Sequence, residues 1–156
     1  MTRRQDFSTA IVWTGDRGDG TRHYRGYDRS WRIAPPGKPP VEASNDPALG
    51  GDATKHNPEE LLLASLSACH MLWYLHLASE AGIVVHGYED RPLGIGESGP
   101  GGAGRFLRAV LRPCIRVARG ADLERADALH HQIGQSCFIA RSVNFPVTYE
   151  ARYLET

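Results

Sequence analysis

The chain has 156 residues, of which 41% are hydrophobic and 23% are charged. This composition is ordinary for a globular protein, and the length suits one domain, residues 1–156, that buries roughly two-thirds of its unfolded surface. The formal net charge of zero argues against a general nucleic-acid or membrane-surface binder. Three cysteines are too few for a disulfide scaffold, so we expect a reducing, cytoplasmic compartment and thiols that serve chemistry.

The N-terminal third predicts short strands and loops. Residues 7–13 predict a strand, residues 14–20 a turn, and residues 21–33 a returning strand. Residues 34–52 are rich in Gly, Pro and Asn, which indicates a loop with a short strand around Val41.

The clearest predicted element is a long helix that begins after Asn57. Asn57 is a good N-cap, Pro58 suits the first helical position, and acidic residues follow in the first turn. Apolar side chains then cover almost the whole circumference as far as Gly82, a natural stop. Serines and histidines interrupt the apolar stretch, so we expect a core helix and no membrane span, with Cys69 in its middle.

The second half predicts strands, a helix and a final strand. Residues 83–97 and 105–118 predict an antiparallel hairpin, because apolar residues and arginines alternate along the second segment. Asp122 can cap a helix that runs to about Ile133. A short helix over residues 137–143 and a strand over 147–154 complete an α+β order of elements.

The cysteines differ in their expected surroundings. On residue type alone, a cysteine on an apolar helix, such as Cys69, is more often a small buried hydrophobe than a reactive group. Cys137 follows a turn near the start of the expected short helix, whose dipole favours a thiolate. Cys114 lies on the arginine face of its strand, where we expect an incidental thiol.

Two cysteines on separate elements are compatible with peroxide reduction. A thiolate attacks the O–O bond and becomes a sulfenic acid, which a second thiol then condenses to a disulfide. Positive charge nearby favours the thiolate, and a carboxylate commonly holds the required arginine.

The histidines predict no metal centre. None of their pairs has the spacing of a zinc-binding helix, so a polar core or interface role is the better interpretation; they include His70, His76, His130 and His131. Several large side chains could line an apolar pocket for bulky hydroperoxides, although core packing explains them equally well; these are Met71, Trp73, Tyr74 and Phe138.

Two segments resemble the OsmC/Ohr family. Asn57-Pro-Glu-Glu-Leu61, continuing to Ala64-Ser-Leu-Ser-Ala-Cys69, resembles the motif that precedes the family's peroxidatic cysteine, and residues 137–147 resemble its second cysteine segment. The order of elements agrees along nearly the whole chain. The resemblance implies an OsmC-like fold with antiparallel sheets around a long central helix, and an intertwined homodimer with active sites at its interface.

The resemblance also implies an activity. The chain would be a thiol peroxidase that reduces organic hydroperoxides without a bound cofactor, using a dithiol or lipoyl-type reductant. Cys69 would be the peroxidatic cysteine, Cys137 the resolving cysteine in an intramolecular disulfide, and Glu59 the acidic partner. The activating arginine would be Arg25, by the motif Tyr24-Arg-Gly-Tyr27, or Arg17, by its place in the glycine-rich turn.

Helix geometry restricts the role of Glu59. Ten residues of one straight helix separate Glu59 from Cys69 by about 15 Å of rise, too far to share a substrate. Either the helix starts later or bends, or the Glu59 that serves Cys69 comes from a second subunit.

Two other functions remain open on the sequence. A binding module could keep the fold with inert thiols and hold a small hydrophobic ligand. A redox sensor could form the Cys69–Cys137 disulfide in order to change its partners.

Overall fold

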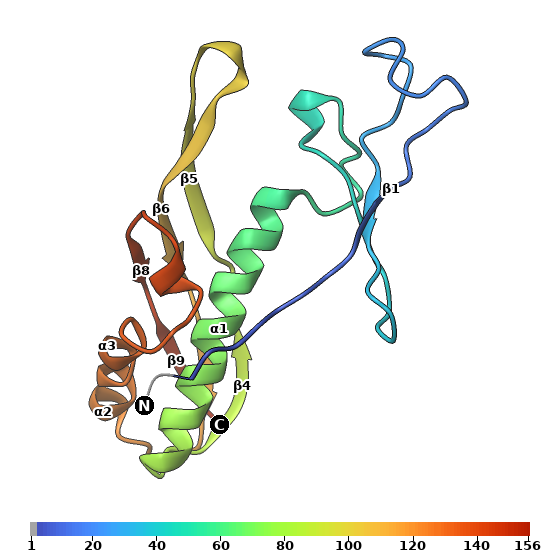
Figure 1. Ribbon diagram of the computed structural model, residues 1–156. Coiled ribbons are helices and arrows are strands. Elements are labelled where there is room, and N and C mark those ends of the chain that lie inside the picture. Colours follow the sequence, from blue (N-terminus) through green and yellow to red (C-terminus); the bar gives the residue numbers. More distant parts are fainter. Residues whose placement is uncertain (1–2) are drawn as a thin grey trace. The chain divides into compact units, whose positions relative to one another are not determined.

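The computed structural model describes residues 3–156, which form two compact units, one up to Leu61 and one from Leu62 onward. Figure 1 follows both along the chain.

The first unit contains a small antiparallel sheet. Its strands are β1 (Ile11–Trp13), β2 (Trp31–Ile33) and β3 (Val41–Ala43), in the order β1-β2-β3, and the 3₁₀ turn η1 (Pro47–Leu49) follows. The short strand at Val41 is confirmed.

The expected strand over residues 21–33 is wrong except at its last three residues. Arg29 lies 4.4 Å from the ring centroids of both Tyr24 and Tyr27, and its guanidinium donates to the backbone carbonyls of the same two residues. These contacts fold the segment around one arginine, so its backbone pairs with no strand.

Helix α1 (Pro58–Glu80) begins where the sequence predicts. Asn57 Oδ1 accepts from the Glu60 N–H at 2.8 Å, and Glu60 Oε2 accepts from the Asn57 N–H at 3.2 Å. This reciprocal pair is a capping box. The helix ends before Gly82, which has a φ of +73° and lets the Ile83 N–H bond back to the Ala78 carbonyl at 2.8 Å.

Burial along α1 differs from the prediction of a helix covered on all sides. The buried residues recur every fourth position and form one stripe: Leu66, His70, Tyr74 and Ala78. Leu72 is 63% exposed. By length and composition α1 is also long and apolar enough to cross a membrane. This is weak evidence for a membrane span, because the core helices of soluble proteins pass the same test.

Two further sheets form the second unit. β4 (Val85–Glu89), β7 (Cys114–Val117) and β9 (Arg152–Glu155) pair in the order β4-β7-β9. β5 (Leu93–Ser98), β6 (Gly104–Leu111) and β8 (Val147–Tyr149) pair in the order β5-β6-β8. The β5–β6 hairpin, joined by the 3₁₀ turn η2 (Pro100–Gly102), is the long yellow arm in Figure 1.

These sheets are mixed, which corrects the expectation of purely antiparallel sheets. β4–β7 and β5–β6 are antiparallel, whereas β7–β9 and β6–β8 are parallel. The last segment of the chain returns beside the hairpin in the direction of its second strand, which produces the parallel pairs.

Each of the three long segments predicted as single strands passes from one sheet to the other. The breaks fall at residues 90–92, 112–113 and 150–151, and prolines occupy two of them. Asp90 joins these breaks to α1, because its carboxylate accepts from the Arg112 N–H and from the Ser67 hydroxyl, both at 2.6 Å.

The helical part of the C-terminal region is more broken than predicted. Asp122 caps α2 (Leu123–Ala128) through the Arg125 N–H at 2.9 Å, and α3 (His130–Ile133) follows as a separate turn. The expected helix over residues 137–143 is reduced to the 3₁₀ turn η3 (Ala140–Ser142), and Cys137 precedes it.

The core of this unit lies between α1, the β4-β7-β9 sheet and the α2–α3 segment. Tyr74 and Ala78 of α1 pack with Ile115 and Val117 of β7. Cys137 belongs to the same buried cluster, so the core itself fixes one of the two candidate redox thiols.

Candidate redox site

The structure brings Cys69 and Cys137 together, although 68 residues separate them along the chain. The Cys137 Sγ donates a hydrogen bond to the Cys69 Sγ at a sulfur–sulfur distance of 2.6 Å. Both are free thiols. A movement of about half an ångström would bring the sulfurs to the length of a disulfide bond.

Backbone hydrogen bonds position Cys137 in its turn. Its N–H donates to the Ile133 carbonyl at 2.8 Å, and its own carbonyl accepts from the Arg141 N–H at 3.1 Å. The Ala140 N–H donates to Sγ at 3.4 Å. Cys69 is positioned by regular helical backbone, because it lies in the middle of α1.

The Cys137 thiol is held in its protonated form. Burial and, to a smaller extent, the hydrogen bond that it donates to Cys69 together raise the pKa of this thiol to about 11. The expectation that a helix dipole favours the Cys137 thiolate is therefore wrong, because no helix begins there and the side chain is only 1% exposed.

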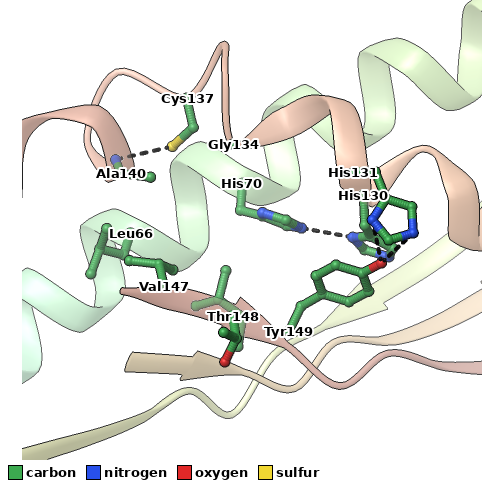
Figure 2. A pocket seen from close by; sticks show the side chains of 11 residues that line it. Leu66, His70, His130, His131, Gly134, Cys137, Ala140, Val147, Thr148 and Tyr149 are labelled. Atoms are coloured by element: carbon green, nitrogen blue, oxygen red, sulfur yellow. Dashed lines mark hydrogen bonds between the residues drawn. The ribbon is translucent and has the colours of Figure 1, made fainter. Parts of the chain in front are cut away.

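A pocket of about 320 Å³ adjoins Cys137. Figure 2 shows Leu66 and Val147 along its wall, Cys137 and Ala140 at one end, and imidazoles with Tyr149 at the other. Its remaining lining residues are Leu111, Gly134 and Thr148.

The large side chains predicted to line a pocket do not line this one. Tyr74 is fully buried in the core, and Trp73 packs against the same core. Phe138 is 56% exposed.

A buried histidine pair forms one wall of the pocket. His70 Nε2 lies 2.7 Å from His130 Nδ1, and the two rings stack with centroids 5.0 Å apart. His130 Nε2 lies 3.1 Å from the Tyr153 hydroxyl, which donates to Asp127 Oδ1 at 3.4 Å. This chain of polar groups therefore runs from the pocket through the core to a partly exposed carboxylate.

Both imidazoles of this pair are neutral at pH 7. Burial lowers the pKa of His70 to about 4, against a smaller opposite effect of Asp90. Burial, with smaller contributions from the neighbouring imidazoles of His70 and His131, lowers the pKa of His130 to about 3. The prediction of a polar core role holds for these two histidines, but their pairing across 60 residues carries no local sequence signal.

The described residues contain no cluster of three or more His, Cys, Asp or Glu side chains arranged to hold a metal ion. In the pair His70 and His130, Nε2 of His70 and Nδ1 of His130 hydrogen-bond to each other.

The predicted acidic partner does not meet Cys69 within one chain. Glu59 and Cys69 both belong to α1, which is continuous from Pro58 to Glu80. Because α1 begins at Pro58, a late start of the helix is excluded. The separation of about 15 Å along the helix axis then excludes a direct contact between Glu59 and Cys69.

The predicted arginines lie in the first unit. Arg17 Nη2 forms an ion pair with Asp28 at 3.0 Å and donates to the Arg25 carbonyl at 3.3 Å. The Arg25 side chain is exposed. Arg29, which no sequence motif marked, is instead the arginine that packs against the rings of Tyr24 and Tyr27.

The fold and the thiol pair define a class of protein. The family model described as OsmC-like protein matches residues 50–152, and the chain therefore belongs to the OsmC-like family. No curated protein sequence matches the chain.

Solved structures agree with this assignment. An OsmC-like protein of unknown function from Vibrio cholerae has a TM-score of 0.84 at 27% identity, covering 95% of this chain and 99% of that one. An organic hydroperoxide resistance protein from Elizabethkingia anophelis has a TM-score of 0.67 at 17% identity, covering 99% and 100%. A second organic hydroperoxide resistance protein, from Legionella pneumophila, has a TM-score of 0.62 at 16% identity, covering 96% and 98%. The last two likenesses concern the fold alone.

Proposed function

We propose that this protein is a thiol peroxidase that reduces organic hydroperoxides, with Cys69 as the peroxidatic and Cys137 as the resolving cysteine. The observation that carries the proposal is the 2.6 Å distance between their sulfurs. A pair this close can close a disulfide before the first thiol is oxidised further.

The environments of the two thiols support this division of roles. Cys69 is partly exposed, so it is the sulfur that a peroxide can reach. Cys137 is buried and keeps its proton, so it is the poorer first nucleophile.

The proposed cycle has two oxidative steps. The Cys69 thiolate attacks the terminal oxygen of ROOH, the O–O bond breaks, and the alkoxide takes up a proton to leave as ROH. The Cys137 sulfur then attacks the Cys69 sulfenic acid, forming the disulfide and releasing water. Two electrons from a dithiol reductant restore the two thiols.

We further propose that the protein works as a homodimer. Glu59 cannot approach Cys69 along its own helix, and Leu72, three residues from Cys69, leaves most of its apolar side chain uncovered. A second copy that covers this face of α1 could supply the Glu59 carboxylate, with Arg25 or Arg17 as the activating cation.

Turnover of cumene hydroperoxide with dithiothreitol tests the proposal. We expect the wild type to consume peroxide, Cys69→Ser to lose at least about a thousandfold in rate, and Cys137→Ser to stop after one oxidation. Cys114→Ser is the matched control and should keep the wild-type rate, because Cys114 lies on β7 outside the thiol pair. A wild type that consumes no hydroperoxide would contradict the proposal and favour a binding role for the pocket.

A further inference from the structure

A chain of four polar side chains ends at the pocket beside Cys137. It begins at the carboxylate of Asp127, passes through Tyr153 and His130, and ends at His70, which lines the pocket. Every hydrogen bond needs one donor and one acceptor. The direction of this chain therefore decides whether His70 offers the pocket a donor or an acceptor.

The carboxylate fixes the direction of the chain. Asp127 Oδ1 accepts from the Tyr153 hydroxyl at 3.4 Å, so the Tyr153 oxygen accepts in turn from the Nε2–H of His130 at 3.1 Å. Chiefly because burial lowers the pKa of His70 to about 4 and that of His130 to about 3, both imidazoles are neutral and carry one N–H each. Nδ1 of His130 is therefore unprotonated and accepts from the Nε2–H of His70 at 2.7 Å. By the same rule, Nδ1 of His70 is unprotonated and can only accept.

This acceptor atom opens to the pocket. Nδ1 of His70 has no hydrogen-bond partner among the described residues, although the residue is only 7% exposed. In the same part of the chain, the wholly buried side-chain nitrogen and oxygen atoms without a partner are the hydroxyls of Tyr74 and Tyr88. Nδ1 is therefore not sealed inside the protein, and the pocket that His70 lines is where another molecule can reach it.

We propose that this pocket binds a small neutral molecule with a hydroxyl group on an apolar body, and that the hydroxyl donates to Nδ1 of His70. Within the described chain no Lys, Arg, Asp or Glu lines the pocket, so no permanent charge balances an ionic ligand. Leu66, Leu111 and Val147 supply apolar walls, as Figure 2 shows for the labelled residues. The volume of about 320 Å³ lies at the lower end of small-molecule sites.

Neither redox cysteine takes part in this binding. Cys69 is not among the residues that line the pocket, and Cys137 is only 1% exposed. The inference therefore goes beyond the proposed peroxidase and does not depend on it. The ligand is recognised by its hydrogen-bond donor, whereas a reaction would need an exposed sulfur.

The direction of the polar chain makes the site selective. A carbonyl compound of the same shape would place its oxygen lone pairs against the unprotonated Nδ1 of His70. Both atoms would then lack a hydrogen bond at a buried position, which is costly. A site built to pair with a hydroxyl rejects the analogue without one for this reason.

The alcohol 1-phenylethanol and the ketone acetophenone test this selectivity. They share one carbon skeleton, and both are neutral, but only the alcohol carries a donor. Isothermal titration calorimetry at pH 7.5 should show that the alcohol binds about tenfold tighter or more. Equal affinities, or no binding of the alcohol at millimolar concentration, would overturn the inference.

Gly134 tests the location of the site. This residue lines the pocket, has helical φ and ψ of −56° and −28°, and has open space around an added Cβ. Gly134→Trp should therefore fill the pocket without backbone strain and weaken binding of the alcohol by about tenfold or more. Gln135→Trp adds the same bulk to the next, exposed residue, which does not line the pocket, and should bind as the wild type does. Equal binding by the two variants would place the ligand elsewhere.

Tyr153→Phe tests the direction of the chain. The change removes the oxygen that accepts from His130, so the two imidazoles are free to reverse their hydrogen bond and His70 can offer an N–H to the pocket. We expect the preference for the alcohol over the ketone to disappear. Tyr88→Phe removes a buried hydroxyl outside the chain and should keep the preference. A preference that survives in Tyr153→Phe would contradict the assigned direction.

The state of His70 can also be measured without a ligand or a variant. Nitrogen-15 NMR of the imidazoles in the wild-type protein distinguishes a protonated from an unprotonated ring nitrogen. We expect the hydrogen on Nε2 and none on Nδ1 in both His70 and His130 at pH 7.5. A hydrogen on Nδ1 of His70 would overturn the inference, because the pocket would then offer a donor.

Discussion

At the scale of single residues, the two cysteines differ in exposure because one lies in a regular helix and the other lies in a turn. A regular helix holds Cys69, whereas Cys137 sits in a turn fixed by the Ile133 carbonyl and by the Arg141 and Ala140 amides. One sulfur is partly accessible and the other is buried in the core. The sulfur–sulfur contact thus joins a partly exposed thiol to a buried one.

The histidine pair predicts a loss of stability in acid. In the unfolded chain the pKa of histidine is about 6.5, whereas burial lowers it to about 4 for His70 and to about 3 for His130. The unfolded state therefore binds more protons below pH 6.5. The stabilisation is fully present above that pH and is lost as the pH falls toward 4 and 3, by several kcal/mol for the two histidines together.

Urea unfolding at pH 7.5 and at pH 4.5 measures this effect. His130→Phe keeps an aromatic ring between Tyr74 and Tyr149 and should show a smaller loss between the two pH values. His76→Gln, at an exposed position on the same helix as His70, should keep the wild-type loss. An identical loss in wild type and His130→Phe would show that the pair is not its source.

At the scale of elements, Asp90 links the break between β6 and β7 to helix α1 through hydrogen bonds. It is partly buried and accepts two short hydrogen bonds, from Ser67 of α1 and from the Arg112 amide at the break between β6 and β7. Pro113 follows Arg112 and has no N–H for a sheet ladder, so the carboxylate satisfies the last donor before the break.

Removal of this carboxylate should destabilise the second unit. We expect Asp90→Ala to lower the free energy of unfolding by about 3 kcal/mol and Ser67→Ala by about 1 kcal/mol, because hydrogen bonds to charged groups contribute more than neutral ones. Thermal or urea unfolding measures both, and Glu89→Ala, at an exposed neighbouring position, is the control. A cost for Asp90→Ala no larger than that for Glu89→Ala would contradict this role.

Elements with local signals were predictable from the sequence. The start of α1 followed from Asn57 and Pro58, and its end from Gly82, because caps act within a few residues. The breaks within the long strands were missed, although Pro113 marks one of them. The segment before β2 was misassigned because Arg29 and its tyrosines override the strand preference of aromatic residues.

At the scale of the whole molecule, the exposed Leu72 of α1 and the distance of Glu59 from Cys69 along the helix predict self-association. Analytical ultracentrifugation should find a dimer, and Leu72→Glu should weaken it, because Leu72 is 63% exposed on the proposed interface. Leu123→Glu is the matched control, since an acidic residue in the first turn of α2 is favourable. A monomer at micromolar concentration in the wild type would contradict the dimer.

The candidate site was predictable only where a motif marks it. The two cysteine motifs predicted Cys69 and Cys137 as partners, and the fold brings their sulfurs together. The pair His70 and His130 was missed because its members meet only through the packing of α1 against α3. The roles of Glu59 and of the arginines stay predictions, since they depend on a second copy of the chain.

The measurement that tests the central claim most directly is the fate of the thiols after one equivalent of cumene hydroperoxide. Reduced protein is mixed with the peroxide, alkylated, digested and mapped by mass spectrometry. The account predicts a disulfide between the peptides of Cys69 and Cys137, an alkylated Cys114, and a sulfenic acid on Cys69 in the Cys137→Ser variant. Full alkylation of all three cysteines in the wild type, or oxidation that begins at Cys137 in the Cys69→Ser variant, would contradict it.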